Sequence, residues 1–162
     1  MRPSTRIAKD TFKDPIIAVE VGVYQGDNAL SMLQNLPIKR MYLIDPYEVF
    51  VEPSSKMGRS ADFPKNEYIA REKLKDYDCL WIKKRSDQVE IEPADFVYLD
   101  GSHEYENVMY DLEYFYEVVE PGGILAGHDY NAKSGVKRAV NEFVQKNSLK
   151  LEIHHPDWVI RK

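Results

Sequence analysis

The sequence has only one cysteine, Cys79, and no apolar run near the roughly 20 residues that a membrane-spanning helix requires. A single cysteine excludes a disulfide within the chain and suits a reducing compartment. Residues 1–15 also lack the apolar segment of a secretory signal peptide. We therefore expect a cytoplasmic protein with no membrane partner.

Basic residues are also outnumbered by acidic ones. The chain carries 22 lysines and arginines against 27 aspartates and glutamates, which gives a formal net charge of −5 at pH 7. Proteins that bind nucleic acid usually carry a basic patch or stripe. The densest basic run here, Lys83-Lys84-Arg85, is more simply explained as the solvated end of a strand. We therefore expect no nucleic-acid partner.

The remaining composition is that of a folded globular protein, with 43% hydrophobic and 30% charged residues among 162. A chain of this length is most simply one domain with a sizeable core, so we expect residues 1–162 to form a single domain. Residues 1–14 are polar and mixed in charge, with room for a short helix but no predicted function. Eleven tyrosines leave apolar surface available for a homodimer.

Residues 47–64 show no clear period and contain two prolines, Pro53 and Pro64. The stretch is too long for an ordinary connection, and long loops in compact domains often serve as lids or substrate walls. We expect it to be a lid or substrate loop. The alternative is a disordered surface excursion.

The clearest local pattern is a strand, a glycine turn and a helix between residues 16 and 35. An apolar run carries Glu20 near its end, Gly22 and Gly26 follow, and apolar residues then take up helical spacing until Pro37. Such a unit opens an open α/β sheet. Its turn lets the polar part of a ligand approach bare backbone at a helix N-terminus.

The rest of the chain alternates apolar runs with amphipathic stretches. We expect an α/β fold in three layers: a Rossmann-like, doubly wound, mostly parallel sheet with a C-terminal antiparallel hairpin. Further strands are predicted at residues 41–46, 79–82, 95–103 and 124–130, helices at 66–77, 105–119 and 134–146, and the hairpin at 149–154 and 157–160.

Acidic residues and histidines recur where these predicted strands end. Any one of them alone is explained as a solvated loop residue, but their recurrence after five successive runs indicates a ligand site at the carboxyl edge of the sheet. Asp45 lies about 20 residues past the glycine turn, where nucleotide-binding folds place the carboxylate that accepts ribose hydroxyls. The residues at these ends are Glu20, Asp45, Asp87, Asp100, His103, His128 and Asp129.

Four motifs in this order resemble class I S-adenosylmethionine-dependent methyltransferases, and the small branch of macrocin-type and catechol-type O-methyltransferases most of all. The resemblance runs from about residue 16 to residue 162. It is carried by residues 20–26 (EVGVYQG), 43–46 (LIDP), 95–103 (DFVYLDGSH) and 121–129 (PGGILAGHD).

The resemblance implies a role for each matching position. The turn departs from the fuller G-x-G-x-G form, because Glu20 and Tyr24 take the outer positions around Gly22. Asp45 would hold the ribose, and Asp100 would lie near the sulfonium and the reacting atom. The methionine half of the cofactor would be walled by Glu20, Gly22, Val23, Tyr24 and Gly26, and the adenine bordered by Ser86 and Asp87.

Two catalytic elements are expected beside the cofactor. His103 is the candidate base, since an imidazole pKa of about 6.5 suits neutral pH; the alternative is a structural histidine at a helix start. Related O-methyltransferases bind a divalent cation at the position of Asp100 and at the end of the fifth strand. Asp100 and Asp129 are thus candidate magnesium ligands, although His128 in that pair departs from the pattern.

Together these features predict methyl transfer from S-adenosylmethionine to a small-molecule acceptor, at oxygen, with Mg²⁺ as an optional second cofactor. Two alternatives stay open. One is a non-catalytic protein that binds S-adenosylmethionine or another nucleotide. The other is a nicotinamide-dependent oxidoreductase, which is disfavoured because the chain leaves little room for a substrate domain.

Overall fold

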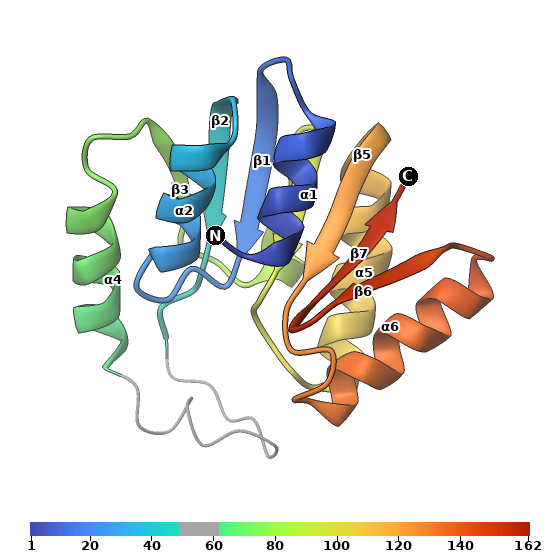
Figure 1. Cartoon of the computed structure of the whole chain (residues 1–162). Helices are drawn as coiled ribbons and strands as arrows, with labels where there is room; N and C mark the ends of the chain where they lie inside the picture. The colour runs from blue at the N-terminus through green and yellow to red at the C-terminus, as the bar shows by residue number, and fades with distance from the viewer. Residues whose placement is uncertain (49–61) are drawn as a thin grey trace.

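The computed structural model describes residues 1–48 and 62–162 and places seven strands in one sheet, in the order β3-β2-β1-β4-β5-β7-β6 (Figure 1). β1, β2, β3, β4 and β5 pair in parallel. β7 runs antiparallel to both β5 and β6. The strands are β1 (Ile16–Val21), β2 (Ile38–Ile44), β3 (Cys79–Ile82), β4 (Ala94–Leu99), β5 (Val119–Gly127), β6 (Leu151–His154) and β7 (Asp157–Arg161).

Helices cover both faces of this sheet, so the fold has three layers (Figure 1). One buried cluster lies between the sheet and α1, α2 and α4, and a second lies between the sheet and α5 and α6. The predicted Rossmann-like sheet with its closing hairpin is confirmed. The helices are α1 (Pro3–Thr11), α2 (Asp27–Asn35), α4 (Phe63–Lys73), α5 (Tyr105–Val118) and α6 (Ser134–Lys146), with a 3₁₀ turn, η1, at Ser86–Gln88.

Alternation along the strands assigns side chains to the two faces, because successive residues of a strand point to opposite sides. In β1, Ala18 joins the cluster beneath α1 and α2, and its neighbour Val19 joins the cluster beneath α5 and α6. In β4, Phe96 and Val97 divide in the same way. The near-continuous apolar runs in the sequence therefore reflect strands that are buried on both faces.

Several boundaries differ from the sequence-based expectation. β2 begins at Ile38 rather than at residue 41, because Ile38 already pairs with Ile16 of β1. α4 begins at Phe63 rather than at residue 66. There the carboxylate of Asp62 caps the helix by accepting a hydrogen bond from the Lys65 amide at 3.2 Å, and a proline lies in the first turn.

The helix before β5 also ends earlier than expected. α5 stops at Val118, and the following Pro-Gly-Gly segment belongs to β5 rather than to a break between helix and strand. A register shift in the β4–β5 pairing accommodates this segment, and Gly122 donates a backbone hydrogen bond to Lys162. The proline therefore lies at an irregular part of the strand, where the missing N–H does not interrupt a regular ladder of hydrogen bonds.

Two predicted segments need separate comment. Residues 3–11 of the polar N-terminal segment form α1, which buries Ser4, Thr5 and Ala8. Of the expected loop at 47–64, residues 49–61 lie outside the described residues, and residues 63 and 64 belong to α4. Within the described part of the chain, no helix has both the length and the apolar character needed to cross a membrane.

Candidate active site

The glycine turn after β1 lies against the end of β4. Gly22 has φ +86°, a left-handed conformation that favours glycine. A Cβ at this position would lie 2.2 Å from the backbone oxygen of Asp100. Because of this close approach, the backbone segments that follow β1 and β4 lie directly against each other.

Asp45 shapes this turn from the end of β2. Its Oδ2 accepts hydrogen bonds from the amides of Val23 at 2.9 Å and Tyr24 at 3.0 Å, and its Oδ1 accepts one from the Tyr47 amide at 2.8 Å. Burial raises the pKa of Asp45, and these amides oppose the rise. A carboxylate offers about four lone-pair sites, so Asp45 retains capacity to accept a ligand hydroxyl.

A cleft of about 500 Å³ opens along this edge of the sheet. Glu20, Val23 and Gly26 are absent from its lining: Glu20 and Val23 are buried, and Gly26 precedes α2 as its N-cap. The predicted cofactor residues that line the cleft are Gly22, Tyr24, Asp45, Ser86, Asp87 and Asp100.

Glu20 is buried beneath the turn. Its Oε1 accepts a hydrogen bond from Nδ2 of Asn28 at 2.9 Å, and its Oε2 has no hydrogen-bond partner among the described residues. Burial raises the pKa of Glu20 to about 8, and the nearby charge of Asp100 adds to the rise. At neutral pH the carboxyl group is therefore mainly protonated.

Asp111 of α5 is a cleft residue that the sequence interpretation missed. It is buried and lines the cleft, and burial raises its pKa to about 6. Within residues 1–48 and 62–162, its Oδ1 has no hydrogen-bond partner. A hydrogen bond with Ser86 opposes that rise and links α5 to η1. The available signal was an acid between Val108 and Leu112, on the apolar face of an amphipathic helix.

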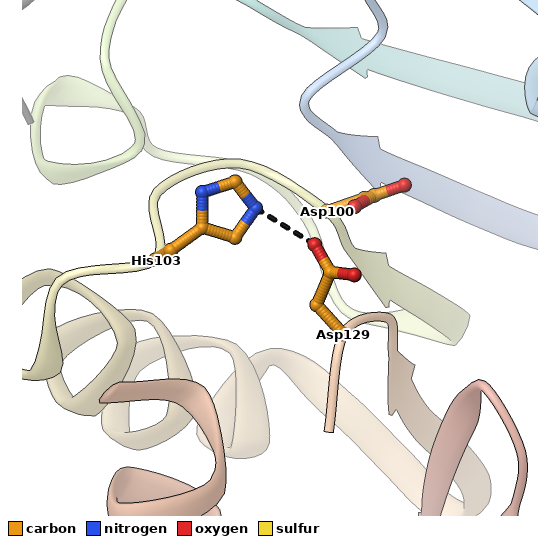
Figure 2. Close-up of side chains that lie close together, drawn as sticks. All are labelled: Asp100, His103 and Asp129. Atoms are coloured by element: carbon orange, nitrogen blue, oxygen red, sulfur yellow. Dashed lines mark ion pairs between the residues drawn. The ribbon is translucent and has the colours of Figure 1, made fainter. Parts of the chain in front are cut away.

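Asp100, His103 and Asp129 come together at the ends of β4 and β5 (Figure 2). His103 Nε2 lies 2.9 Å from Asp129 Oδ2. One potential ligand atom from each of the three residues lies within 4.8 Å of the others. His128 contacts both carboxylates, with its Nδ1 at 3.1 Å from Asp129 Oδ1 and 3.6 Å from Asp100 Oδ1.

The two carboxylates in this cluster differ in their electrostatics. Hydrogen bonds from His103 and His128 hold the pKa of Asp129 well below its usual range. Burial raises the pKa of Asp100 to about 6, although His128 and Arg2 oppose the rise. Asp129 is thus a permanent negative charge that can orient an imidazole, as carboxylates do in catalytic acid–base pairs.

Arg2 is the second residue that the sequence interpretation missed. Its Nη2 lies 3.1 Å from Asp100 Oδ2, across 98 residues of sequence. The residue precedes α1, in the segment for which the sequence predicted no function. The N-terminal segment therefore reaches the cluster at the carboxyl edge of the sheet.

Comparison with known proteins assigns a family to this arrangement. The model of a family described as "Methyltransferase domain" matches residues 19–130, which include the glycine turn, Asp45, Asp100 and Asp129. An uncharacterized protein of Acanthamoeba polyphaga mimivirus is 28% identical over 143 residues. The match spans 82% of this chain and 61% of that relative.

Solved structures share the fold at low sequence identity. The O-methyltransferase NovP has a TM-score of 0.73 at 19% identity, with 98% of this chain and 78% of that chain covered. An O-methyltransferase from Bacillus cereus in complex with SAH gives 0.62 at 12% identity, covering 100% and 82%. An rRNA methylase from Streptococcus thermophilus gives 0.66 at 18% identity, covering 99% and 95%.

The family model covers more than half of the chain, and the three solved structures share its fold over 98% to 100% of its length. The chain therefore belongs to this methyltransferase family and has the fold of the class I S-adenosylmethionine-dependent methyltransferases.

Proposed function

We propose that the protein transfers a methyl group from S-adenosylmethionine to a hydroxyl oxygen of a small molecule. The observation that carries the proposal is the adjacency of two features at one edge of the sheet. An acid-rimmed cleft beside a bare glycine backbone shares Asp100 with the cluster that contains His103 and Asp129. One feature suits the cofactor, and the other suits proton transfer from an acceptor.

The cleft residues fit the parts of the cofactor that the resemblance assigns to them. Gly22 and Tyr24 would border the methionine half, and Asp45 would accept the ribose hydroxyls. Ser86 and Asp87 would border the adenine. Glu20, Val23 and Gly26 would support the turn from behind, since they lie outside the cleft lining. The neighbour in complex with SAH supports this assignment at the level of the fold.

The bound cofactor supplies an electrophilic methyl group on a sulfonium cation. The protein's task is to align the acceptor with that methyl group and to receive the acceptor's proton. Asp100 places negative charge beside the cofactor cleft, which favours a cationic ligand. His103 takes the proton from the acceptor hydroxyl, and Asp129 stabilises the resulting imidazolium from 2.9 Å.

Asp100 and Asp129 are also the residues that would hold a magnesium ion. Carboxylate oxygens are the ligands that this ion prefers, and the spacing within the cluster permits a shared ion. A bound ion would lower the pKa of an acceptor hydroxyl. The imidazole of His103 is a softer third donor, and one oxygen of Asp100 already faces Arg2.

A small molecule suits the charge of the protein better than a nucleic acid does. The rRNA methylase shares the fold, but the net charge of −5 and the acidic cleft rim disfavour a phosphate backbone. We keep the cytoplasm and a homodimer as expectations from the sequence. Gel filtration with light scattering tests the dimer, and a stable monomer at assay concentration would remove it.

Turnover separates the proposed enzyme from its alternatives. Folded protein is incubated with S-adenosylmethionine and pools of small hydroxyl compounds, and formation of S-adenosylhomocysteine is followed by mass spectrometry. Acceptor-dependent product supports the proposal. Binding of the cofactor without turnover on any pool favours a binding protein. Displacement of the bound cofactor by NADH but not by S-adenosylhomocysteine favours an oxidoreductase.

A further inference from the structure

Arg2 is held beside Asp100 by three separate contacts. Besides the 3.1 Å contact to Asp100 Oδ2, its Nη1 lies 3.8 Å from Asp157 Oδ1. Its guanidinium carbon stands 5.5 Å from the centre of the Tyr98 ring, within the range of a cation–π contact. Only 30% of the Arg2 side chain is exposed, so this is not a freely solvated arginine.

The start of α1 is itself anchored. Asp157, at the start of β7, is fully buried and accepts hydrogen bonds from the Ser4 amide at 3.1 Å, the Ser4 hydroxyl at 2.6 Å and the Tyr98 hydroxyl at 3.1 Å. A buried carboxylate is tolerated only with such partners, and its position at a helix N-terminus is favourable. The backbone that carries Arg2 is thus fixed to the sheet.

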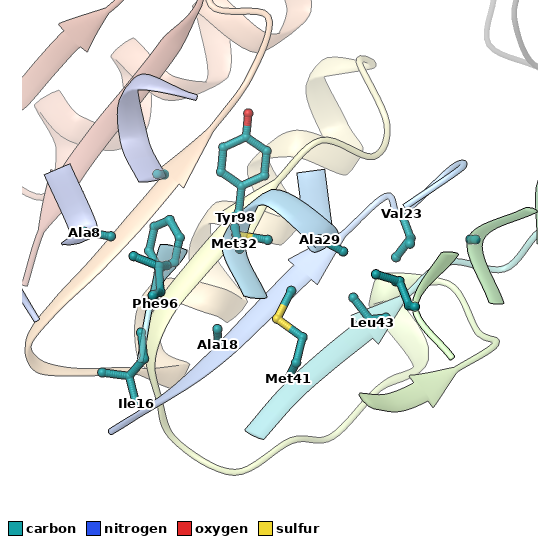
Figure 3. Packing of buried hydrophobic residues seen from close by; sticks show 14 of the residues in the cluster. Ala8, Ile16, Ala18, Val23, Ala29, Met32, Met41, Leu43, Phe96 and Tyr98 are labelled. Carbon is teal, nitrogen blue, oxygen red and sulfur yellow. The ribbon is translucent and has the colours of Figure 1, made fainter. Parts of the chain in front are cut away.

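The body of α1 is fixed to the sheet by apolar packing. Ala8 belongs to the buried cluster that contains Phe96 and Tyr98 of β4 (Figure 3). In Figure 1 the N-terminus lies at the edge of the sheet where the arrowhead of β1 ends. Packing and hydrogen bonds together therefore deliver the guanidinium to the carboxyl end of β4.

The contact changes what Asp100 can bind. Arg2 faces Oδ2, and His128 faces Oδ1 at 3.6 Å. A guanidinium is a cation at every pH relevant to proteins and presents fixed donors to a carboxylate. A divalent cation between Asp100 and Asp129 would meet this charge at close range, where like charges repel.

We propose that Arg2 is the resident cation of the active site. Its guanidinium takes the place beside Asp100 that a divalent ion would take, so such an ion binds only when Arg2 withdraws. The inference uses the proposed function only in treating Asp100 as part of the active site. It assigns the N-terminal segment a role in deciding whether the site contains a metal ion.

Manganese is the probe, because protein-bound Mn²⁺ loses the electron paramagnetic resonance signal of the free ion. Wild-type protein is titrated beside Arg2→Met and Arg2→Gln, which remove the charge. Arg6→Met is the matched control, since Arg6 is exposed on the same helix. Circular dichroism and thermal unfolding establish that each variant is folded.

We expect both Arg2 variants to bind Mn²⁺ at least tenfold more tightly than wild type, and Arg6→Met to match wild type. Adding Asp129→Asn to Arg2→Gln should remove the gain, which places the ion at the cluster. Equal affinity in wild type and the Arg2 variants overturns the proposal, as does the absence of binding in all of them. A gain that survives Asp129→Asn overturns the assigned position.

Titration of S-adenosylhomocysteine into the same proteins keeps this inference separate from the proposed function. A protein that gains Mn²⁺ affinity on loss of Arg2 but never binds S-adenosylhomocysteine retains the inference and loses the function. A protein that binds S-adenosylhomocysteine but shows no effect of Arg2 on its Mn²⁺ affinity retains the function and loses the inference.

Discussion

Replacement of Asp45 by alanine tests the link between the glycine turn and the cofactor. The carboxylate accepts hydrogen bonds from three amides, and two of their residues, Val23 and Tyr47, are buried. A buried donor left without a partner costs about 1–3 kcal/mol. Two such donors predict a loss of about 2–6 kcal/mol in the free energy of unfolding, with the lower half favoured where water enters the space.

The same substitution should weaken cofactor binding. Loss of charge-assisted hydrogen bonds to the ribose hydroxyls costs about 1–3 kcal/mol, which corresponds to about 5- to 150-fold in affinity. Calorimetric titration of S-adenosylhomocysteine measures the affinity, and urea unfolding measures the stability. Asp76→Ala is the control, since Asp76 is an exposed acid of the same charge.

An analogue of S-adenosylhomocysteine without ribose hydroxyls separates the two effects. If Asp45 contacts the ribose, the loss of affinity on Asp45→Ala should shrink with this analogue. An unchanged affinity for S-adenosylhomocysteine in the folded variant would refute the ribose assignment. An unchanged free energy of unfolding would refute the role of Asp45 in holding the turn.

Three further predictions follow from the site. Gly22→Ala should lower the urea midpoint by more than Gly122→Ala, because both have φ +86° but only Gly22 places a Cβ against backbone, at 2.2 Å; equal losses would contradict this. The free energy of unfolding should fall as the pH rises from about 4 to about 8, because the raised pKa of Glu20 means that the folded state holds a proton that the unfolded state has lost. Glu20→Gln should flatten this fall, and parallel profiles of urea stability against pH in the two proteins would contradict the prediction. His103→Ala should lower kcat by about 10²- to 10⁴-fold with little change in S-adenosylhomocysteine affinity, and full turnover would remove His103 as the base.

The sequence predicted the sheet and the edge of the site because both depend on local patterns. Apolar runs reveal strands buried on both faces, and the carboxyl ends of parallel strands necessarily meet at one edge. Asp45, Asp100 and Asp129 could therefore be assigned to one site before any coordinates. The pairing of His103 with Asp129, at 2.9 Å, follows from the adjacency of β4 and β5.

Other features depend on contacts that the sequence does not encode locally. Arg2 reaches Asp100 across 98 residues, and only the docking of α1 on the sheet brings them together. Asp111 lies on a face of α5 that its apolar neighbours mark as buried. The sequence pattern does not show that the carboxylate itself is buried beside Ser86, because that contact depends on tertiary packing. The start of α4 was missed because the Asp62 cap precedes a stretch with little apolar periodicity.

Calorimetric titration of S-adenosylhomocysteine into folded, cofactor-free wild-type protein tests the central claim most directly. The account predicts one site per chain with a dissociation constant on the order of micromolar, or about −8 kcal/mol. A folded protein that shows no binding at millimolar ligand would contradict the account, and the shared fold would then carry a different function.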